Sequence, residues 1–144
     1  MIKSVEHTHN FGESQDNKPL YINFDGLEKV LQDEECKKLL INTKAVYLLT
    51  DKKNGMLYVG SAYGAKMLFG RWNQYMNSLK NDSDKLNHFG VKIKKKGKDY
   101  IKDNIYFSIL ETFDPITSDE VIIKCENWWK KVLMTREGFG YNEN

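Results

Sequence analysis

The sequence has few cysteines and histidines, and it lacks a long apolar run. Among its 144 residues there are two cysteines and three histidines. Cys36 and Cys125 are far apart, with no C-x-x-C pair and no histidine at metal-ligand spacing, so we expect free thiols. No run approaches the roughly 20 apolar residues of a membrane-spanning helix, and no charged start followed by an apolar stretch indicates a signal peptide. We therefore expect a cytoplasmic protein that does not interact with membranes.

The composition is typical of a folded domain. Hydrophobic residues make up 40% of the chain, aromatic residues 12% and charged residues 29%, which argues against a disordered protein. A chain of 144 residues can bury one sizeable core but scarcely two. We therefore interpret the sequence as a single domain with an N-terminal extension.

The small net charge of +2 conceals a strongly basic segment. Between Lys85 and Lys102 there are seven lysines and one acid, whereas residues 103–120 contain five acids and no base. Such a cluster of lysines can follow a phosphate backbone. A solvated lysine-rich loop is the alternative, and charge alone does not separate the two interpretations.

The first 43 residues divide into two parts. Residues 1–19 are polar and aperiodic, and they predict a flexible tail in which His7 and His9 lie on the surface rather than hold a metal. Residues 20–43 are predicted as a helical lead that packs on the core, because apolar residues recur there at helical intervals. The remainder, residues 44–144, is predicted as the main domain.

Two short apolar runs, AVYLLT and MLYVG, predict a β-hairpin. Both runs are rich in β-branched and aromatic residues, and Asn54-Gly55 between them supplies the positive φ that hairpin turns need. If the turn closes at Thr50, Tyr47 lies opposite Tyr58 and both rings point to one face of the sheet. A bulge at the turn glycine would change this register.

Three further segments follow the hairpin. Residues 66–80 predict a helix with an apolar stripe. Arg71 and Tyr75 are four residues apart, so they lie together on the face next to that stripe. The stretch from 81 to 103 is rich in Asn, Asp, Lys and Gly, and we interpret it as loops. Residues 104–112 predict a third strand.

The last predicted helix carries a carboxylate on its apolar face. Thr117 and Glu120 resemble a capping box that opens this helix, which runs to about Met134. At about 100° per residue, one broad face holds Val121, Ile122, Cys125, Trp128, Trp129, Val132 and Leu133, with Glu126 among them. Burying an unpaired carboxylate is costly, so Glu126 must meet a cation, a metal or a hydrogen-bond donor, or lie at the mouth of a cleft. A purely structural ion pair with a lysine is the alternative to a functional role.

Taken together, these residues resemble the GIY-YIG nuclease family. Its two name-giving tripeptides are matched by AVY at 45–47 and YVG at 58–60, which are separated by ten residues. The other matches are Arg71 on the next helix, Tyr75 one turn later, Glu126 on a later helix and Asn142 near the end. The resemblance covers about residues 44–144. Ala45 departs from it, since the family usually has glycine at that position.

The resemblance implies an α+β fold with a small three-stranded antiparallel sheet flanked by helices. It also implies a DNA endonuclease that hydrolyses phosphodiester bonds with one divalent metal ion, Mg²⁺ or Mn²⁺. Glu126 would hold the metal, Arg71 would stabilise the phosphate in the transition state, and Tyr58 would act as the general base. A non-catalytic module that binds nucleic acid on the same scaffold is the alternative function.

The same resemblance gives supporting roles to three more residues. Tyr47 would orient the water or the phosphate, Tyr75 would support the site, and Asn142 would position the substrate or Glu126. Either Lys66 or His88 would assist the base, and the sequence does not choose between them.

The partner expected from the charge pattern is a nucleic acid. The predicted nucleic-acid-binding residues are Lys66, Lys92, Lys94, Lys95, Lys96 and Lys98. DNA is the expected substrate, while the preference for DNA over RNA, a homodimer and a separate specificity module are all left open.

Overall fold

The computed structural model describes residues 19–81, 86 and 89–143. Nearly all of the predicted tail, with His7 and His9, lies outside the described residues, as do Lys85 and His88. Both cysteines are free thiols, as predicted. Within the described ranges, no helix is long and apolar enough to cross a membrane.

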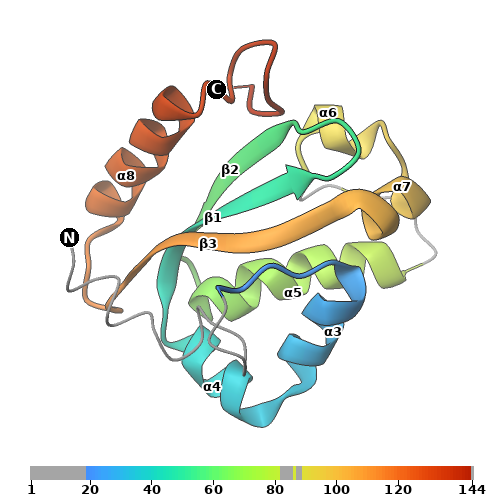
Figure 1. The fold of residues 1–144 in the computed structure, drawn as a ribbon. Coiled ribbons are helices and arrows are strands. Elements are labelled where there is room, and N and C mark those ends of the chain that lie inside the picture. Colours follow the sequence, from blue (N-terminus) through green and yellow to red (C-terminus); the bar gives the residue numbers. More distant parts are fainter. Residues whose placement is uncertain (1–18, 82–85, 87–88, 144) are drawn as a thin grey trace.

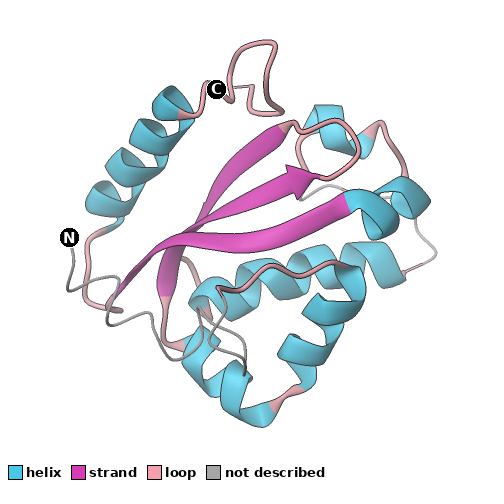
Figure 2. Cartoon of the chain, viewed as in Figure 1, coloured by secondary structure: helices cyan, strands magenta, loops and turns pink. Residues whose placement is uncertain are grey.

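A three-stranded antiparallel sheet forms the centre of the fold (Figures 1 and 2). The strands are β1 (Lys44–Asp51), β2 (Leu57–Ala62) and β3 (Ile105–Phe113). They lie in the order β2-β1-β3, so that β1 is central and β2 is an edge strand. The predicted fold class is therefore confirmed.

Helices cover both faces of this sheet (Figure 1). On one face lie α3 (Phe24–Gln32), α4 (Glu34–Ile41) and α5 (Met67–Lys80), and their apolar residues form the main core with the sheet. On the other face α8 (Asp119–Val132) buries Ile122 against Val46 and Val59 in a smaller cluster. The segment before α3 also joins the sheet, since Ile22 exchanges two backbone hydrogen bonds with Phe107.

The register of the hairpin differs from the predicted one. Tyr47 pairs with Gly60, and Tyr58 pairs with Leu49. The two tyrosines are therefore diagonal neighbours on the same face rather than direct partners. The reason is that the turn closes at Asp51, not at Thr50, because the Asp51 amide donates to the Met56 carbonyl.

Asp51 is held in this position by a buried network. Its carboxylate is fully buried and accepts hydrogen bonds from the Tyr100 hydroxyl at 2.7 Å and the Tyr141 hydroxyl at 2.5 Å. It also accepts one from the Lys53 amide in the turn at 3.0 Å. A buried carboxylate is stable only when its oxygens are satisfied in this way, so the network ties the hairpin turn to two later segments of the chain.

The prediction of loops from 81 to 103 was wrong in its second half. This stretch contains the short helices α6 (Val91–Lys94) and α7 (Lys98–Asn104). Each buries one isoleucine, Ile93 in α6 and Ile101 in α7. Helices this short show no sustained apolar period, and burial of a single side chain against the domain stabilises each of them.

The last helix differs from its prediction in two ways. Its N-cap is Ser118 rather than Thr117, since the Ser118 hydroxyl accepts from the Val121 amide at 3.4 Å. Its apolar face is also only partly buried, because about half of the Trp128 and Val132 side chains remains exposed. A sheet of three strands is too narrow to cover such a broad face, and α8 contacts β2 and β1.

Candidate active site

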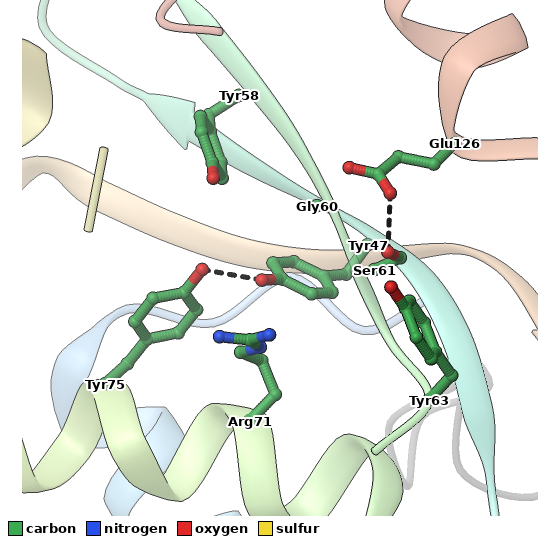
Figure 3. A pocket seen from close by; sticks show the side chains of 8 residues that line it. All are labelled: Tyr47, Tyr58, Gly60, Ser61, Tyr63, Arg71, Tyr75 and Glu126. Carbon is green, nitrogen blue, oxygen red and sulfur yellow. Dashed lines mark hydrogen bonds between the residues drawn. The ribbon is translucent and has the colours of Figure 1, made fainter. Parts of the chain in front are cut away.

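A polar pocket of about 210 Å³ lies along the edge strand β2, between α5 and α8 (Figure 3). It is lined by Tyr47, Tyr58, Gly60, Ser61, Tyr63, Arg71, Tyr75 and Glu126. These residues come from β1, from β2 and the turn after it, and from both helices. The fold thus gathers all the predicted catalytic residues except Asn142 in one cavity. Ser61 and Tyr63 were not singled out in the sequence, because small and aromatic residues are ordinary in strands.

Tyr47 reaches the pocket because its strand partner has no side chain. A Cβ atom added at Gly60 would lie 2.5 Å from the Tyr47 hydroxyl oxygen, far inside van der Waals contact. The ring therefore lies across the Gly60 backbone, and its hydroxyl forms a 2.6 Å hydrogen bond with the Tyr75 hydroxyl. Both tyrosines are almost completely buried, and this burial raises their pKa values well above that of free tyrosine.

Tyr58 is more accessible than the buried pair Tyr47 and Tyr75. Its hydroxyl points into the cavity (Figure 3) and has no hydrogen-bond partner among residues 19–81, 86 and 89–143. Burial raises the pKa of this phenol, the Glu126 carboxylate raises it further, and the Arg71 guanidinium opposes both effects. Tyr58 is therefore a neutral phenol at pH 7 in the absence of an added cation.

Arg71 enters the pocket from the second turn of α5. Its guanidinium makes a weak contact with the Gln74 side chain, at 3.4 Å, which leaves most of its donors directed at the cavity. The N-cap of the helix is Lys66, which adopts a left-handed conformation with φ of +59°. The chain before the helix therefore packs closely on its first turn, and a Cβ at Gly70 would lie 2.4 Å from the Ala65 carbonyl oxygen. The interior glycine of this helix is thus explained by close backbone packing just before Arg71.

Glu126 lies on the opposite side of the pocket, on α8. Its Oε1 accepts a 2.6 Å hydrogen bond from the Ser61 hydroxyl, and its Oε2 forms a 3.0 Å ion pair with Lys130 one turn later. Its side chain is 17% exposed. The lysine partner left open in the sequence is therefore present, and the carboxylate also lines the pocket. Lys130 was not singled out as this partner, because Lys124, Lys130 and Lys131 all lie near Glu126 in the sequence.

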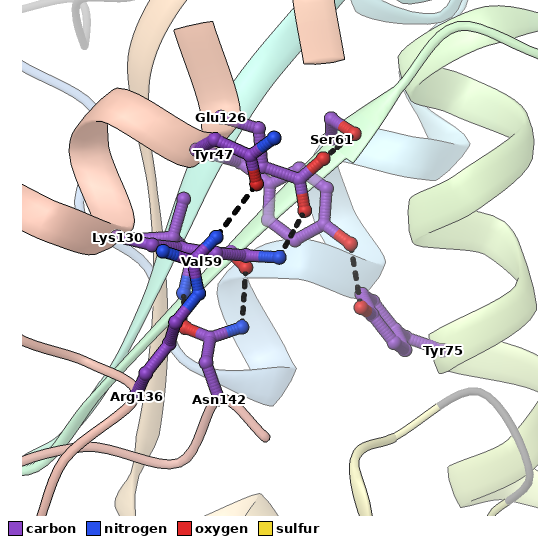
Figure 4. Close-up of polar contacts among 9 residues, drawn as sticks. Tyr47, Val59, Ser61, Tyr75, Glu126, Lys130, Arg136 and Asn142 are labelled. Carbon is purple, nitrogen blue, oxygen red and sulfur yellow. Dashed lines mark hydrogen bonds and ion pairs between the residues drawn. The ribbon is translucent and has the colours of Figure 1, made fainter. Parts of the chain in front are cut away.

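Asn142 is not among the residues that line the pocket. Its side-chain oxygen accepts from the Val59 amide at 2.8 Å, and its side-chain nitrogen donates to the Val59 carbonyl at 2.9 Å (Figure 4). Both polar ends of this buried amide are thus used by one residue of β2. Asn142 thus pairs with the edge strand at Val59, between Tyr58 and Gly60.

The predicted lysines lie partly beside the pocket. Gly90, the residue before α6, packs against the Tyr58 ring, so the basic helix adjoins the cavity. Lys92 donates to the Gly140 carbonyl at 3.5 Å, and Lys94 and Lys95 are exposed. Lys96 lies 5.1 Å from the centre of the Tyr100 ring. Of the remaining two, Lys98 contacts the Asn81 carbonyl and Lys66 is exposed at the start of α5.

A divalent cation at this pocket would have one carboxylate ligand from the chain. No group of three or more His, Cys, Asp or Glu side chains that could hold a metal occurs in the described part of the chain. Mg²⁺ is commonly bound through one or two carboxylates, with water and substrate phosphates as its other ligands. The Glu126 carboxylate, with polar hydroxyls around it, fits such a site.

The cysteines are not nucleophile candidates. Burial, with Asp33 nearby, raises the pKa of Cys36 to about 11. Burial and a hydrogen bond to Glu111 raise the pKa of Cys125 to about 12. Because the thiolate is the reactive form, both groups are inert near neutral pH.

Comparison with known proteins gives a consistent result. The family model for the GIY-YIG catalytic domain matches residues 43–142. The structure is similar to the catalytic domain of the homing endonuclease I-TevI, with a TM-score of 0.54 and 26% identity over 70% of this chain and 98% of that one. It is also similar to a mutant form of the catalytic domain of intron endonuclease I-TevI, with a TM-score of 0.55 and 24% identity over 71% and 94% of the two chains. No curated protein sequence matches the chain.

Proposed function

Because this chain belongs to the GIY-YIG family of nuclease catalytic domains, we propose that it is an endonuclease that hydrolyses phosphodiester bonds in DNA with the help of one divalent metal ion. The observation that carries the proposal is the convergence of Tyr58, Arg71 and Glu126 on one pocket. These side chains come from β2, from α5 and from α8, the last of which is distant in sequence from the other two. Together they offer a phenol, a guanidinium and a carboxylate, which can serve as base, phosphate-binding donor and metal ligand in phosphodiester hydrolysis.

Glu126 is the residue that would hold the metal. Of the residues lining the pocket it is the one carboxylate, and carboxylate oxygen is the ligand that Mg²⁺ and Mn²⁺ prefer. A bound Mg²⁺ or Mn²⁺ would neutralise charge on the phosphate and help the 3′ oxygen to leave. Ser61 holds one oxygen of the carboxylate and thereby orients it toward the cavity.

Tyr58 is the proposed general base. The negative charge of Glu126 raises the pKa of this phenol, so a cation bound to the carboxylate would reverse that effect and ease removal of the proton. The phenolate formed in this way would then accept a proton from water, directly or through another water. The positive charge of a metal bound to Glu126 would thus also make the Tyr58 phenol easier to deprotonate.

Arg71 and the Tyr47–Tyr75 pair complete the proposed site. The guanidinium fork of Arg71 is suited to the phosphate oxygens, where it stabilises the charge that develops in the transition state. Tyr47 is too deeply buried to exchange a proton at neutral pH. Its hydroxyl, fixed by Tyr75, instead orients the water or the phosphate.

The proposed substrate is a nucleic acid that passes over α6 and the pocket. The exposed lysines in and directly after α6, at positions 92, 94 and 95, lie close to Gly90, which packs against the Tyr58 ring. Their charges would hold the phosphate backbone beside the pocket. The alternative, a module that binds nucleic acid without cutting it, is favoured by one observation: Lys130 already neutralises Glu126.

A plasmid assay separates the two functions. Supercoiled DNA is incubated with the protein and Mg²⁺ or Mn²⁺, beside samples with EDTA. We expect metal-dependent nicking that falls by roughly 100-fold or more in Glu126→Gln, because the metal loses its ligand from the chain. Glu120→Gln is the matched control, since Glu120 is exposed on the same helix, and it should cut as the wild type does. Intact plasmid together with a gel shift of the DNA would support the binding module.

A further inference from the structure

Lys130 is a nearly buried lysine beside the proposed metal ligand. Its side chain is 8% exposed, and its ammonium nitrogen lies 3.0 Å from Oε2 of Glu126, one helical turn earlier (Figure 4). Most lysines of this protein are exposed, and burying an ammonium group is costly unless it is paired. A lysine in this position therefore acts on Glu126 more strongly than a surface lysine would.

The carboxylate of Glu126 is engaged at both oxygens. Ser61 donates to Oε1 and Lys130 pairs with Oε2. An ionised carboxylate offers about four lone-pair sites, so each oxygen can still accept one further ligand from the pocket side. The two partners thus fix the orientation of the carboxylate and leave it able to bind a cation.

The charge balance around the pocket is unfavourable for a second cation. Arg71 lines the cavity and Lys130 adjoins it, against the single carboxylate of Glu126 among the lining residues. A divalent ion on Glu126 would be repelled by Lys130 at short range, and this repulsion is weakly screened at a site that is largely buried. A substrate phosphate would add the negative charge that offsets it.

We propose that Lys130 is a positioning residue that keeps the affinity of Glu126 for divalent metal low until a phosphate of the substrate occupies the pocket. This inference rests on the proposed function of Glu126 as the metal ligand. Lys130 holds the carboxylate in its active orientation and supplies a positive charge in place of the metal. The ion and the nucleic acid then bind together, so that the free protein does not carry a loaded site.

Metal binding by the free protein tests this role without reference to activity. Binding of Mn²⁺ is measured by electron paramagnetic resonance in the absence of nucleic acid for wild type and Lys130→Met. We expect about tenfold tighter binding in Lys130→Met, because the competing charge is gone. Lys130→Gln, which keeps a donor but not the charge, should show the same change if the methionine variant does not fold. Lys130→Arg retains the charge and should bind as weakly as the wild type.

The controls separate this inference from the proposed function. Lys131→Met removes an exposed neighbouring charge on the same helix and should leave Mn²⁺ binding unchanged. Equal affinity in wild type, Lys130→Met and Lys130→Gln, with binding lost in Glu126→Gln, would overturn the role of Lys130 and leave the metal ligand intact. If Glu126→Gln is added to the Lys130 variants and Mn²⁺ binding persists, Glu126 is refuted as the metal ligand.

Discussion

At the scale of single residues, a missing side chain shapes the site as much as the polar groups do. Gly60 is the residue of the edge strand over which the Tyr47 ring passes. Its lack of a Cβ allows a tyrosine from the central strand to reach a pocket at the sheet edge. The glycine of the YVG tripeptide thus has a packing role that follows from the register of the hairpin, and does not depend on a positive φ.

Gly60→Ala is expected to disturb both stability and cleavage. The added Cβ would lie 2.5 Å from the Tyr47 hydroxyl, so the ring must move away from Tyr75. We expect a loss of about 2 kcal/mol in the free energy of unfolding from overpacking and a fall of roughly 100-fold in cleavage from misplacement of the site. Urea unfolding and plasmid nicking measure the two effects.

Gly64→Ala is the matched control for this substitution. Nothing lies within 4 Å of a Cβ at Gly64, and the residue follows the same strand. Wild-type stability and cleavage are expected. A Gly60→Ala variant that behaves like this control would show that Tyr47 adapts without cost, and that its position is not needed.

At the scale of elements, the edge strand is held in place by the end of the chain. Asn142 forms two hydrogen bonds with Val59, and the Tyr141 amide donates to the Leu57 carbonyl at 2.8 Å. These contacts act on either side of Tyr58, on a strand that lies at the edge of the sheet. The terminal asparagine thus supports the site by fixing the backbone of β2.

Asn142→Ala should therefore loosen β2 and destabilise the whole domain. The change leaves the amide and carbonyl of Val59, a fully buried residue, without their partner. We expect a loss of about 3 kcal/mol in the free energy of unfolding, measured by urea denaturation. Asn77→Ala, at an exposed helical position, should be neutral. A near-neutral Asn142→Ala variant that still failed to cut DNA would indicate a direct catalytic role.

The lysines at the end of α6 and directly after it lead to a separate prediction about DNA binding. Replacing Lys94, Lys95 and Lys96 by alanine should weaken DNA affinity and reduce the slope of log affinity against log salt by about 2 to 3. The measurement is a fluorescence anisotropy titration at several salt concentrations. The control is a second triple variant that removes the exposed lysines 29, 38 and 131. An equal change in both variants would indicate a non-specific effect of net charge.

At the scale of the whole molecule, two buried tyrosines make the stability of the fold sensitive to alkali. Burial raises the pKa of Tyr47 and of Tyr75 above that of the unfolded chain, which is about 10. The stabilisation is fully present below pH 10 and is lost as the pH rises above it, because only the unfolded state then ionises. Each tyrosine contributes a slope of about 1.4 kcal/mol per pH unit.

The double variant Tyr47→Phe with Tyr75→Phe tests this sensitivity. It removes the two hydroxyls of one hydrogen bond together, so neither is left without a partner. Urea unfolding between pH 8 and 11 should show a shallower loss of stability in the variant than in the wild type. Parallel curves for the two proteins would show that these phenols ionise in the folded state as they do in the unfolded one.

The sequence was sufficient for the type and order of most elements, because apolar periodicity and turn residues are local signals. It placed three strands and the long helices, and it marked Tyr47, Tyr58, Arg71, Tyr75 and Glu126 as candidates. The short helices α6 and α7 escaped it, since each depends on one buried isoleucine. Local patterns cannot report the burial that stabilises such elements.

The contacts of the candidate residues depended instead on how the elements pack. A shift in the turn changed the partner of Tyr47 from Tyr58 to Gly60, because Asp51 is bound by residues about 50 and 90 positions away. Packing also places Lys130 beside Glu126, and it pairs the Asn142 side chain with Val59. Hydrogen bonds and ion pairs between distant segments are set by three-dimensional distance and burial, so residue types followed from the sequence, whereas their partners followed from the tertiary structure.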